Sequence, residues 1–88
     1  LFFSADDIAF PMTCRGWRSG DRFRPLGMNG FKKLSDFFKD MKMDKRAKES
    51  QPLLVDGENI VCLPGLRIDD RYKIKTSTKI VAEVNILN

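Results

Sequence analysis

The sequence contains no histidine among its 88 residues, so it lacks the side chain that most often serves as a general base and as a zinc ligand. Its two cysteines, Cys14 and Cys62, lie too far apart in the chain to form a metal-binding motif. No apolar run approaches the roughly 20 residues that a membrane-spanning helix needs. We therefore expect no metal site and no insertion into a membrane.

Signatures of nucleotide chemistry are also missing. Residues 20–33, G-D-R-F-R-P-L-G-M-N-G-F-K-K, are rich in glycine and cations, but they lack the G-x-x-x-x-G-K-[ST] spacing of a phosphate-binding loop. Asp69 and Asp70 are neighbours, and neighbours on a regular strand point to opposite faces, so they cannot serve one reaction centre there. We expect them to form ion pairs with Arg67 or Arg71, or a turn. The chain is accordingly expected to hold no catalytic residue and no cofactor.

The length limits what the chain can build. Residues 1–88 suit one small domain, near the lower end of sizes at which a core is stable without disulfides or metal. The chain begins at Leu1 without an initiator methionine, and it lacks the basic start and long apolar stretch of a signal peptide, which together predict a fragment of a longer protein. Both cysteines lie in apolar stretches, a pattern typical of buried, reduced thiols in a cytoplasmic protein, while a disulfide between them stays open as the alternative.

Positive charge is what the sequence has in excess, and it is concentrated in one part. The net charge is +4, but residues 15–48 hold eleven Lys or Arg against four acids. Four arginines in this part are interrupted by glycines and by Pro25, which predicts an ordered loop with special backbone angles at Gly20 and Gly27. Such asymmetry is typical of a surface that meets phosphates, and the alternative is a solvated face without a partner.

Apolar periodicity predicts an α+β domain of short, mostly antiparallel strands packed with one main helix. The Asp56-Gly57 dipeptide between two apolar runs is a strong hairpin signal. Pro11 has no backbone N–H, so its strand should lie at a sheet edge or begin after it. The expected strands cover residues 1–3, 8–15, 52–55, 60–63, 66–74 and 78–87. The main helix is expected over residues 31–43, with Asn29 or Gly30 placed to begin it. Residues 43–50 should form a solvated helix or a linker turn, which Asp44 could cap.

Three blocks resemble the C-terminal domain of bacterial tRNA(Ile)-lysidine synthetase: residues 10–38 (F-P-M-T-C-R-G-W-R-S-G-D-R-F-R-P-L-G-M-N-G-F-K-K-L-S-D-F-F), 52–54 (P-L-L) and 65–72 (G-L-R-I-D-D-R-Y). The resemblance implies a fold shared with a domain of the phenylalanyl-tRNA synthetase β chain. It also implies an accessory role in a tRNA-modifying ligase, whose N-terminal domain uses ATP to attach lysine to the wobble cytidine of an isoleucine tRNA. That domain carries an S-G-G-x-D-S loop, which this chain lacks. Residues 43–50 depart from the family's pattern.

In that family the C-terminal domain helps to hold the tRNA, chiefly at its acceptor stem. A duplex stem is gripped mainly through phosphates and 2′-hydroxyls, which Lys and Arg contact without a preformed pocket. We expect Lys32 and Lys33 in the first helical turn, where the positive helix end adds to their charge. The stem-binding role is assigned collectively to Arg15, Arg18, Arg22, Arg24, Lys32, Lys33 and Lys39.

Individual members of this set have structural alternatives. Arg22 could tie Asp21 or Asp69 inside the domain instead of meeting a phosphate. Trp17 and Phe23 could stack on terminal bases, but aromatic side chains in so small a domain more often belong to the core.

The chain as a whole has a competing function. It could be a structural module that packs against the N-terminal domain or forms a homodimer, with its charge incidental. Exposed strand edges near Pro11 or over residues 78–87 would favour this alternative.

Overall fold

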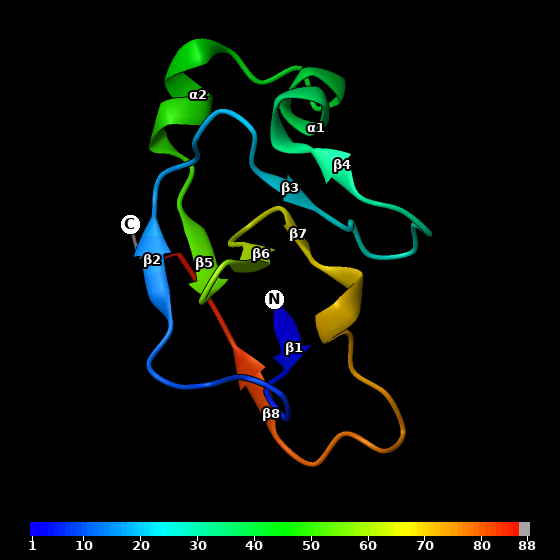
Figure 1. The fold of residues 1–88 in the computed structure, drawn as a ribbon. Coiled ribbons are helices and arrows are strands. Elements are labelled where there is room, and N and C mark those ends of the chain that lie inside the picture. Colours follow the sequence, from blue (N-terminus) through cyan, green and yellow to red (C-terminus); the bar gives the residue numbers. More distant parts are fainter. Residues whose placement is uncertain (87–88) are drawn as a thin grey trace.

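The central sheet is built on the hairpin that the Asp-Gly dipeptide predicts (Figure 1). The computed structural model describes residues 1–86, and in it strand β5 (Leu53–Asp56) pairs antiparallel with β6 (Asn59–Leu63). Gly57 opens the two-residue loop at a φ of 60°, where glycine has no steric cost. Strands β2 (Thr13–Arg15) and β7 (Arg67–Ile68) flank the hairpin, which gives the order β2-β5-β6-β7.

Strand β2 confirms both expectations that Pro11 raised. The strand begins at Thr13, after the proline, and it lies at the edge of the sheet. The expected strand over residues 8–15 is therefore wrong in its first part, because residues 8–12 form no strand.

A separate two-stranded sheet pairs β1 (Phe2–Ser4) antiparallel with β8 (Val81–Glu83). The strand expected over residues 1–3 is thus present but shifted by one residue. The strand expected over residues 78–87 is shorter than predicted, and Leu87 of that range lies outside the described residues. The two strands come from opposite ends of the sequence and lie side by side (Figure 1).

Helix α1 covers Leu34–Asp40, so the helix expected over residues 31–43 is wrong at both ends, and it begins at neither Asn29 nor Gly30. Phe31, the first apolar residue of the predicted pattern, precedes the helix and is 56% exposed. The predicted inner face is otherwise confirmed by the buried residues Leu34, Phe37 and Phe38.

The residues before α1 form a strand instead of a helical turn. Lys32–Lys33 are strand β4, which pairs antiparallel with β3 (Arg22–Phe23). The N–H of Leu34 donates to the carbonyl of Asp21 at 2.9 Å, which continues this pairing to the first helical residue. Lys33 therefore has extended dihedral angles and its side chain caps nothing. The expectation that both lysines lie in a helical turn is wrong.

Helix α1 ends in a Schellman motif with Lys42 where glycine is usual, at a φ of 56°. Helix α2 (Lys45–Ser50) then begins as predicted, because the carboxylate of Asp44 accepts the N–H of Ala47 at 2.8 Å. No residue of α2 is buried, which identifies the segment as the solvated helix of the two predicted alternatives. Neither helix in the described part of the chain is long and apolar enough to cross a membrane.

The strand expected over residues 66–74 ends at Ile68. A turn of 3-10 helix, η1 (Asp70–Tyr72), follows because the side chain of Asp69 accepts the N–H of Arg71 at 2.8 Å and bends the chain. The alternation of apolar and charged residues is therefore misleading beyond the second residue of this strand.

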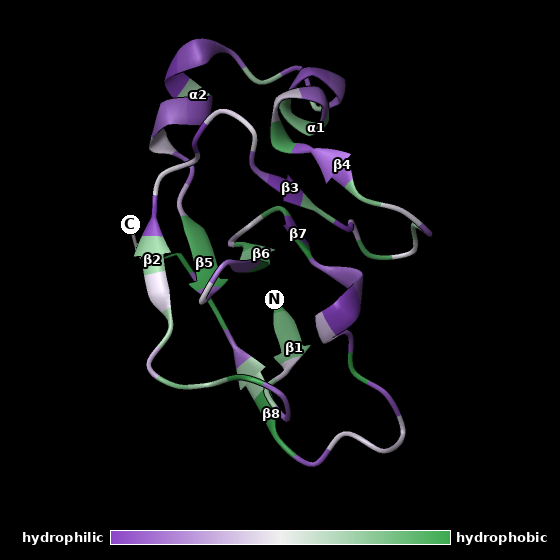
Figure 2. Cartoon of the chain, viewed as in Figure 1, coloured by the Kyte–Doolittle hydropathy of each residue, from purple (hydrophilic) through white to green (hydrophobic). Residues whose placement is uncertain are grey.

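Two groups of buried apolar side chains stabilise these elements. Figure 2 shows apolar residues along β5 and β6, and hydrophilic residues along α2. One group packs α1 against the hairpin and comprises Phe23, Leu34, Phe37, Phe38, Leu53, Val55, Ile60 and Leu63. The other group lies toward β1 and comprises Phe3, Val61, Cys62, Ile68 and Tyr72. Phe23 therefore belongs to the core and is not a platform for bases.

The two cysteines have different environments, which corrects the expectation that both are buried. Cys62 lies in β6 and is fully buried, and burial raises the pKa of its thiol to about 11. Cys14 lies on the edge strand β2 and is exposed. Both thiols are free, without a disulfide.

We expect a thiol reagent to modify one cysteine of the folded chain at about pH 8 and both after unfolding in guanidinium. The thiolate is the reactive form, and Cys62 holds almost none of it at that pH. The count of released chromophore measures this directly. A Cys14→Ser variant should show no fast-reacting thiol, and two fast thiols in the native chain would contradict the burial of Cys62.

Candidate nucleic-acid interface

The β3–β4 pair places two cations side by side on the surface. Arg22 lies directly opposite Lys33, and Phe23 lies opposite Lys32. Phe23 is fully buried, so the alternation of the strand turns Arg22 and its cross-strand partner toward solvent, where both are exposed. The buried phenylalanine thereby fixes the direction in which the two cations point.

This pair of cations has no acid to neutralise it. Within residues 1–86, no Asp or Glu lies at ion-pair distance from Arg22 or Lys33. Like charges directly opposite on neighbouring strands are destabilising. The pair therefore weakens the fold unless an anion from outside binds to it, which is the strongest indication of an anion-binding surface in this structure.

The seven basic residues assigned from the sequence fall into two groups. Four are exposed and have no acidic partner in the part of the chain that the structure describes: Arg18, Arg22, Lys33 and Lys39. The other three form ion pairs inside the domain: Arg15, Arg24 and Lys32. Only the first group offers its full charge to an outside anion.

Arg15 is held by Asp21 through two parallel hydrogen bonds. Its Nη1 and Nη2 donate to Oδ2 and Oδ1 of Asp21 at 2.9 and 3.0 Å. These bonds lower the pKa of Asp21 against the opposing effect of burial, and the backbone N–H of Arg18 acts in the same direction. Arg15, rather than Arg22, is thus the partner of Asp21.

Lys32 points to the other face of the hairpin from its neighbour Lys33. Its ammonium group pairs with the carboxylate of Asp40, in the last turn of α1. This contact joins β4 to the far end of the helix that follows it, so Lys32 has a structural role.

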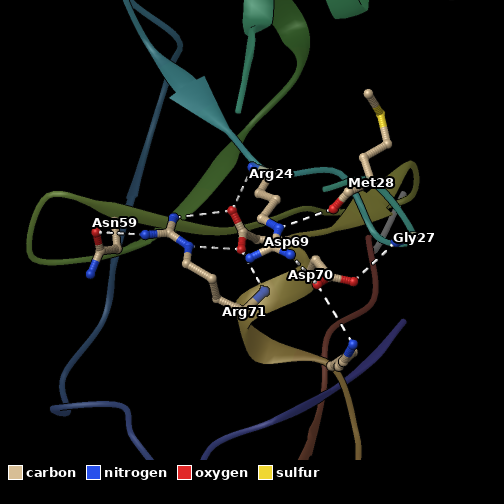
Figure 3. Close-up of polar contacts among 8 residues, drawn as sticks. Arg24, Gly27, Met28, Asn59, Asp69, Asp70 and Arg71 are labelled. Carbon is tan, nitrogen blue, oxygen red and sulfur yellow. Dashed lines mark hydrogen bonds and ion pairs between the residues drawn. The ribbon is translucent and has the colours of Figure 1, made fainter. Parts of the chain in front are cut away.

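Two adjacent carboxylates after β7 hold the segment around Arg24 and Gly27 in place, as Figure 3 shows. Asp69 is fully buried and accepts the backbone N–H of Arg24 at 2.8 Å. It also accepts the backbone N–H, Nε and Nη2 of Arg71, at 2.8 to 3.0 Å. The N–H of Asp70 donates in turn to the carbonyl of Arg24 at 2.6 Å. We call this set of contacts the aspartate clamp.

Asp70 extends the aspartate clamp to the turn that follows β3. Its carboxylate accepts the N–H of Gly27 at 3.1 Å and lies 3.5 Å from the guanidinium of Arg24 and 3.7 Å from the ammonium of Lys73. The hydrogen bond from Gly27 is the first cause that lowers the pKa of Asp70. Gly27 has a φ of 87° and Gly20 a φ of 91°, which confirms the special backbone angles predicted for both.

The ion pairs expected for the two aspartates are confirmed in part. Asp69 pairs with Arg71, as predicted. Arg67 pairs with neither, since its guanidinium lies over the ring of Phe37, 5.3 Å from the centroid. Within residues 1–86, no three His, Cys, Asp or Glu side chains are grouped to hold a metal ion.

Sequence reasoning missed a pocket of the domain. A cavity of about 450 Å³ lies between the loop after β2 and helix α2, lined by Trp17, Ser19, Lys45, Lys48 and Glu49. Figure 1 shows that loop and α2 next to each other. The signal in the sequence was the basic run of residues 45–48, K-R-A-K, but nothing local indicated that it packs beside the tryptophan.

Comparisons with known sequences give a consistent result. The family described as the TilS substrate C-terminal domain matches residues 12–84. The tRNA(Ile)-lysidine synthase of Parabacteroides distasonis is 46% identical over 86 residues, which cover 98% of this chain and 20% of that protein. The synthase of Bacteroides thetaiotaomicron is 44% identical over 77 residues, 88% of this chain and 18% of that protein. The chain thus spans about a fifth of the length of these relatives.

Solved structures share the fold. The crystal structure of a TILS C-terminal domain has a TM-score of 0.76 at 25% identity and covers 91% of this chain and 63% of that chain. An N-terminal fragment of the phenylalanyl-tRNA synthetase β-subunit from Pyrococcus horikoshii has a TM-score of 0.73 at 23% identity, covering 91% of this chain and 25% of that one, and shows the fold alone. Both the resemblance and the α+β fold expected from the sequence are confirmed.

Proposed function

The chain belongs to the TilS substrate C-terminal domain family, and from this we propose that it is the accessory RNA-binding domain of a tRNA(Ile)-lysidine synthase, gripping the acceptor stem of an isoleucine tRNA. On this proposal an N-terminal domain of the same protein converts the wobble cytidine to lysidine with ATP and lysine, in the cytoplasm of a bacterium. The present chain contributes binding and orientation, and no chemistry.

The observation that carries the proposal is the unneutralised pair of Arg22 and Lys33. The deep, narrow major groove of an RNA duplex is closed to side chains, so a protein grips a stem through phosphates and 2′-hydroxyls. Two fixed cations on a rigid β-ladder suit this task, because adjacent phosphates would neutralise the charge repulsion that the free domain carries. Arg18 and Lys39 supply further free cations on the neighbouring loop and helix.

A second candidate function is supported by exposed apolar side chains away from this surface. Phe2, Phe10, Ile80 and Val81 are between 51% and 62% exposed. Phe2 lies opposite Glu83, and Ser4 lies opposite Val81. Residues two apart on a strand point to the same face, so Phe2 and Val81 share the outward face of this two-stranded sheet. Such a face suits packing against the N-terminal domain or a second copy of the chain.

We expect the double variant Arg22→Ala with Lys33→Ala to bind isoleucine tRNA about tenfold or more weakly. Binding to an unrelated RNA hairpin should weaken almost equally, because phosphate contacts carry no sequence information. The slope of log affinity against log salt should fall by about 1.8, from the duplex-DNA value of about 0.9 per phosphate. Titrations at two or more salt concentrations measure both effects.

The matched control is Lys75→Ala with Lys79→Ala, which removes the same charge from exposed positions near β8. It should leave affinity and slope nearly unchanged. The melting temperature of the Arg22 and Lys33 variant should stay the same or rise, since a like-charge pair is relieved. Equal losses of affinity in the two double variants would mean that binding depends on net charge alone and not on this surface. No loss of affinity in the Arg22 and Lys33 variant would refute the proposed interface.

A further inference from the structure

The pocket between the loop after β2 and helix α2 has an aromatic wall. Trp17 is only half-buried, and its inner side packs edge-to-face against Phe38, with ring centroids 5.4 Å apart at 81°. This contact with a fully buried phenylalanine fixes the indole against the core while leaving part of it in the pocket. Packing against the core explains why one side of the Trp17 ring is buried. It does not explain why the other side lines a pocket.

Cations surround the open part of the indole. The ammonium of Lys48 lies 5.9 Å from the centroid of the Trp17 ring, and Lys45 lines the same pocket one helical turn earlier. Neither lysine has an acidic partner at ion-pair distance within residues 1–86. Lys48 is a flexible side chain, so a flat ring can take its place on the indole while its charge moves to a phosphate.

From this arrangement we infer that the pocket binds one unpaired nucleotide of an RNA, with its base stacked on Trp17 and its phosphates on Lys45 and Lys48. The inference rests on the proposed RNA-binding function and adds a single-stranded site to it. Aromatic stacking with basic side chains along the backbone is how proteins hold single-stranded nucleic acid. A cavity of about 450 Å³ is within the range of small-molecule sites.

The remaining lining residues fit a base better than an isolated phosphate. Glu49 would repel a bare anion, whereas its carboxylate can accept a hydrogen bond from the exocyclic amine of a base. Ser19 offers a hydroxyl that can donate or accept.

The pocket adjoins the duplex surface through a short piece of chain. Arg18 follows Trp17 directly, and the same loop leads to Arg22 in β3. On this proposal, one end of a duplex bound at the β3–β4 cations faces the pocket. The site would suit an unpaired nucleotide that continues one strand of the stem.

Trp17 is the only tryptophan, so its fluorescence reports on this pocket. The probes are two RNA hairpins with the same stem, one blunt and one with a short unpaired 3′ tail. We expect the tailed hairpin to quench the fluorescence and to bind at least about fivefold more tightly, the gain that one stacked base gives. The blunt hairpin should bind through Arg22 and Lys33 with little quenching.

The variant Lys45→Ala with Lys48→Ala should remove the advantage of the tail, and the control Lys75→Ala with Lys79→Ala should keep it. These lysines lie on a solvated helix, so the fold survives their loss. Equal affinity for both hairpins without quenching overturns the pocket, while the proposed function stands if blunt binding still needs Arg22 and Lys33. If the tailed hairpin still binds more tightly, but the affinity for the blunt hairpin does not depend on Arg22 and Lys33, the result supports the pocket and overturns the duplex surface.

Discussion

Replacing Asp69 with asparagine is expected to lower the free energy of unfolding by about 3 kcal/mol. The Asp69 carboxylate is fully buried and accepts four hydrogen bonds, one from Arg24 and three from Arg71. An amide of the same shape presents an NH₂ group to donors that need an acceptor, and it leaves the Arg71 guanidinium without its counter-charge. For a domain of this size, thermal unfolding should show a melting temperature about 12–24 °C lower than that of the native chain.

The control for this prediction is Asp7→Asn, which removes the same charge from an exposed position. Its effect on the melting temperature should be small, since surface substitutions usually change stability by no more than about 0.5 kcal/mol. A loss of under about 1 kcal/mol in Asp69→Asn would show that the aspartate clamp is dispensable for the fold.

Replacing Phe23 with alanine should lower the free energy of unfolding by about 3–5 kcal/mol, a large part of the stability of a small domain. Phe23 is fully buried and packs edge-to-face on Phe37, with ring centroids 5.0 Å apart at 88°. Deletion leaves a cavity beneath β3 and removes the side chain that keeps Arg22 pointing outward. Chemical denaturation measures the loss, and on the proposed function RNA binding by the surviving folded fraction should also weaken.

Two further variants test whether the loss of stability comes from the buried packing of Phe23. Phe23→Leu keeps most of the apolar volume and should lose clearly less stability than the alanine variant. Phe2→Ala removes an aromatic ring that is 56% exposed and should cost less than about 1 kcal/mol. If both alanine variants lose the same amount, the packing of Phe23 is not what holds β3 on the core.

The parts of the fold that the sequence predicts correctly are those decided by neighbours in the chain. The hairpin follows from a turn dipeptide between two apolar runs, and Asp44 caps α2 through a contact three residues away. Strand β4 could not be predicted in this way. Two residues carry no periodicity, and the spacing of Phe31 and Leu34 is that of a helix, whereas the partner strand that decides the matter begins at Arg22.

The sequence predicted the candidate site only as an excess of basic residues in one part of the chain. Four of the seven assigned cations have no acidic partner within residues 1–86, and the sequence could not separate these four from the three paired ones. Arg22 directly follows Asp21 in the chain and Arg15 lies six residues before it, yet Arg15 is the one that forms the ion pair. The role of Asp70 toward Arg24 depends on a contact across the fold, for which a single sequence offers no sign.

The aspartate clamp also has a consequence for the order in which the chain folds. The hydrogen bond from Arg24 to Asp69 joins positions 45 residues apart, whereas β5 and β6 are joined by a two-residue loop. Closing the longer loop costs more chain entropy, and long-range contacts slow folding. The hairpin can thus form early, while the loop of cations gains its shape only when the last long-range contacts close. A nascent or partly folded chain would carry the same charge without the ordered surface that we propose for RNA binding.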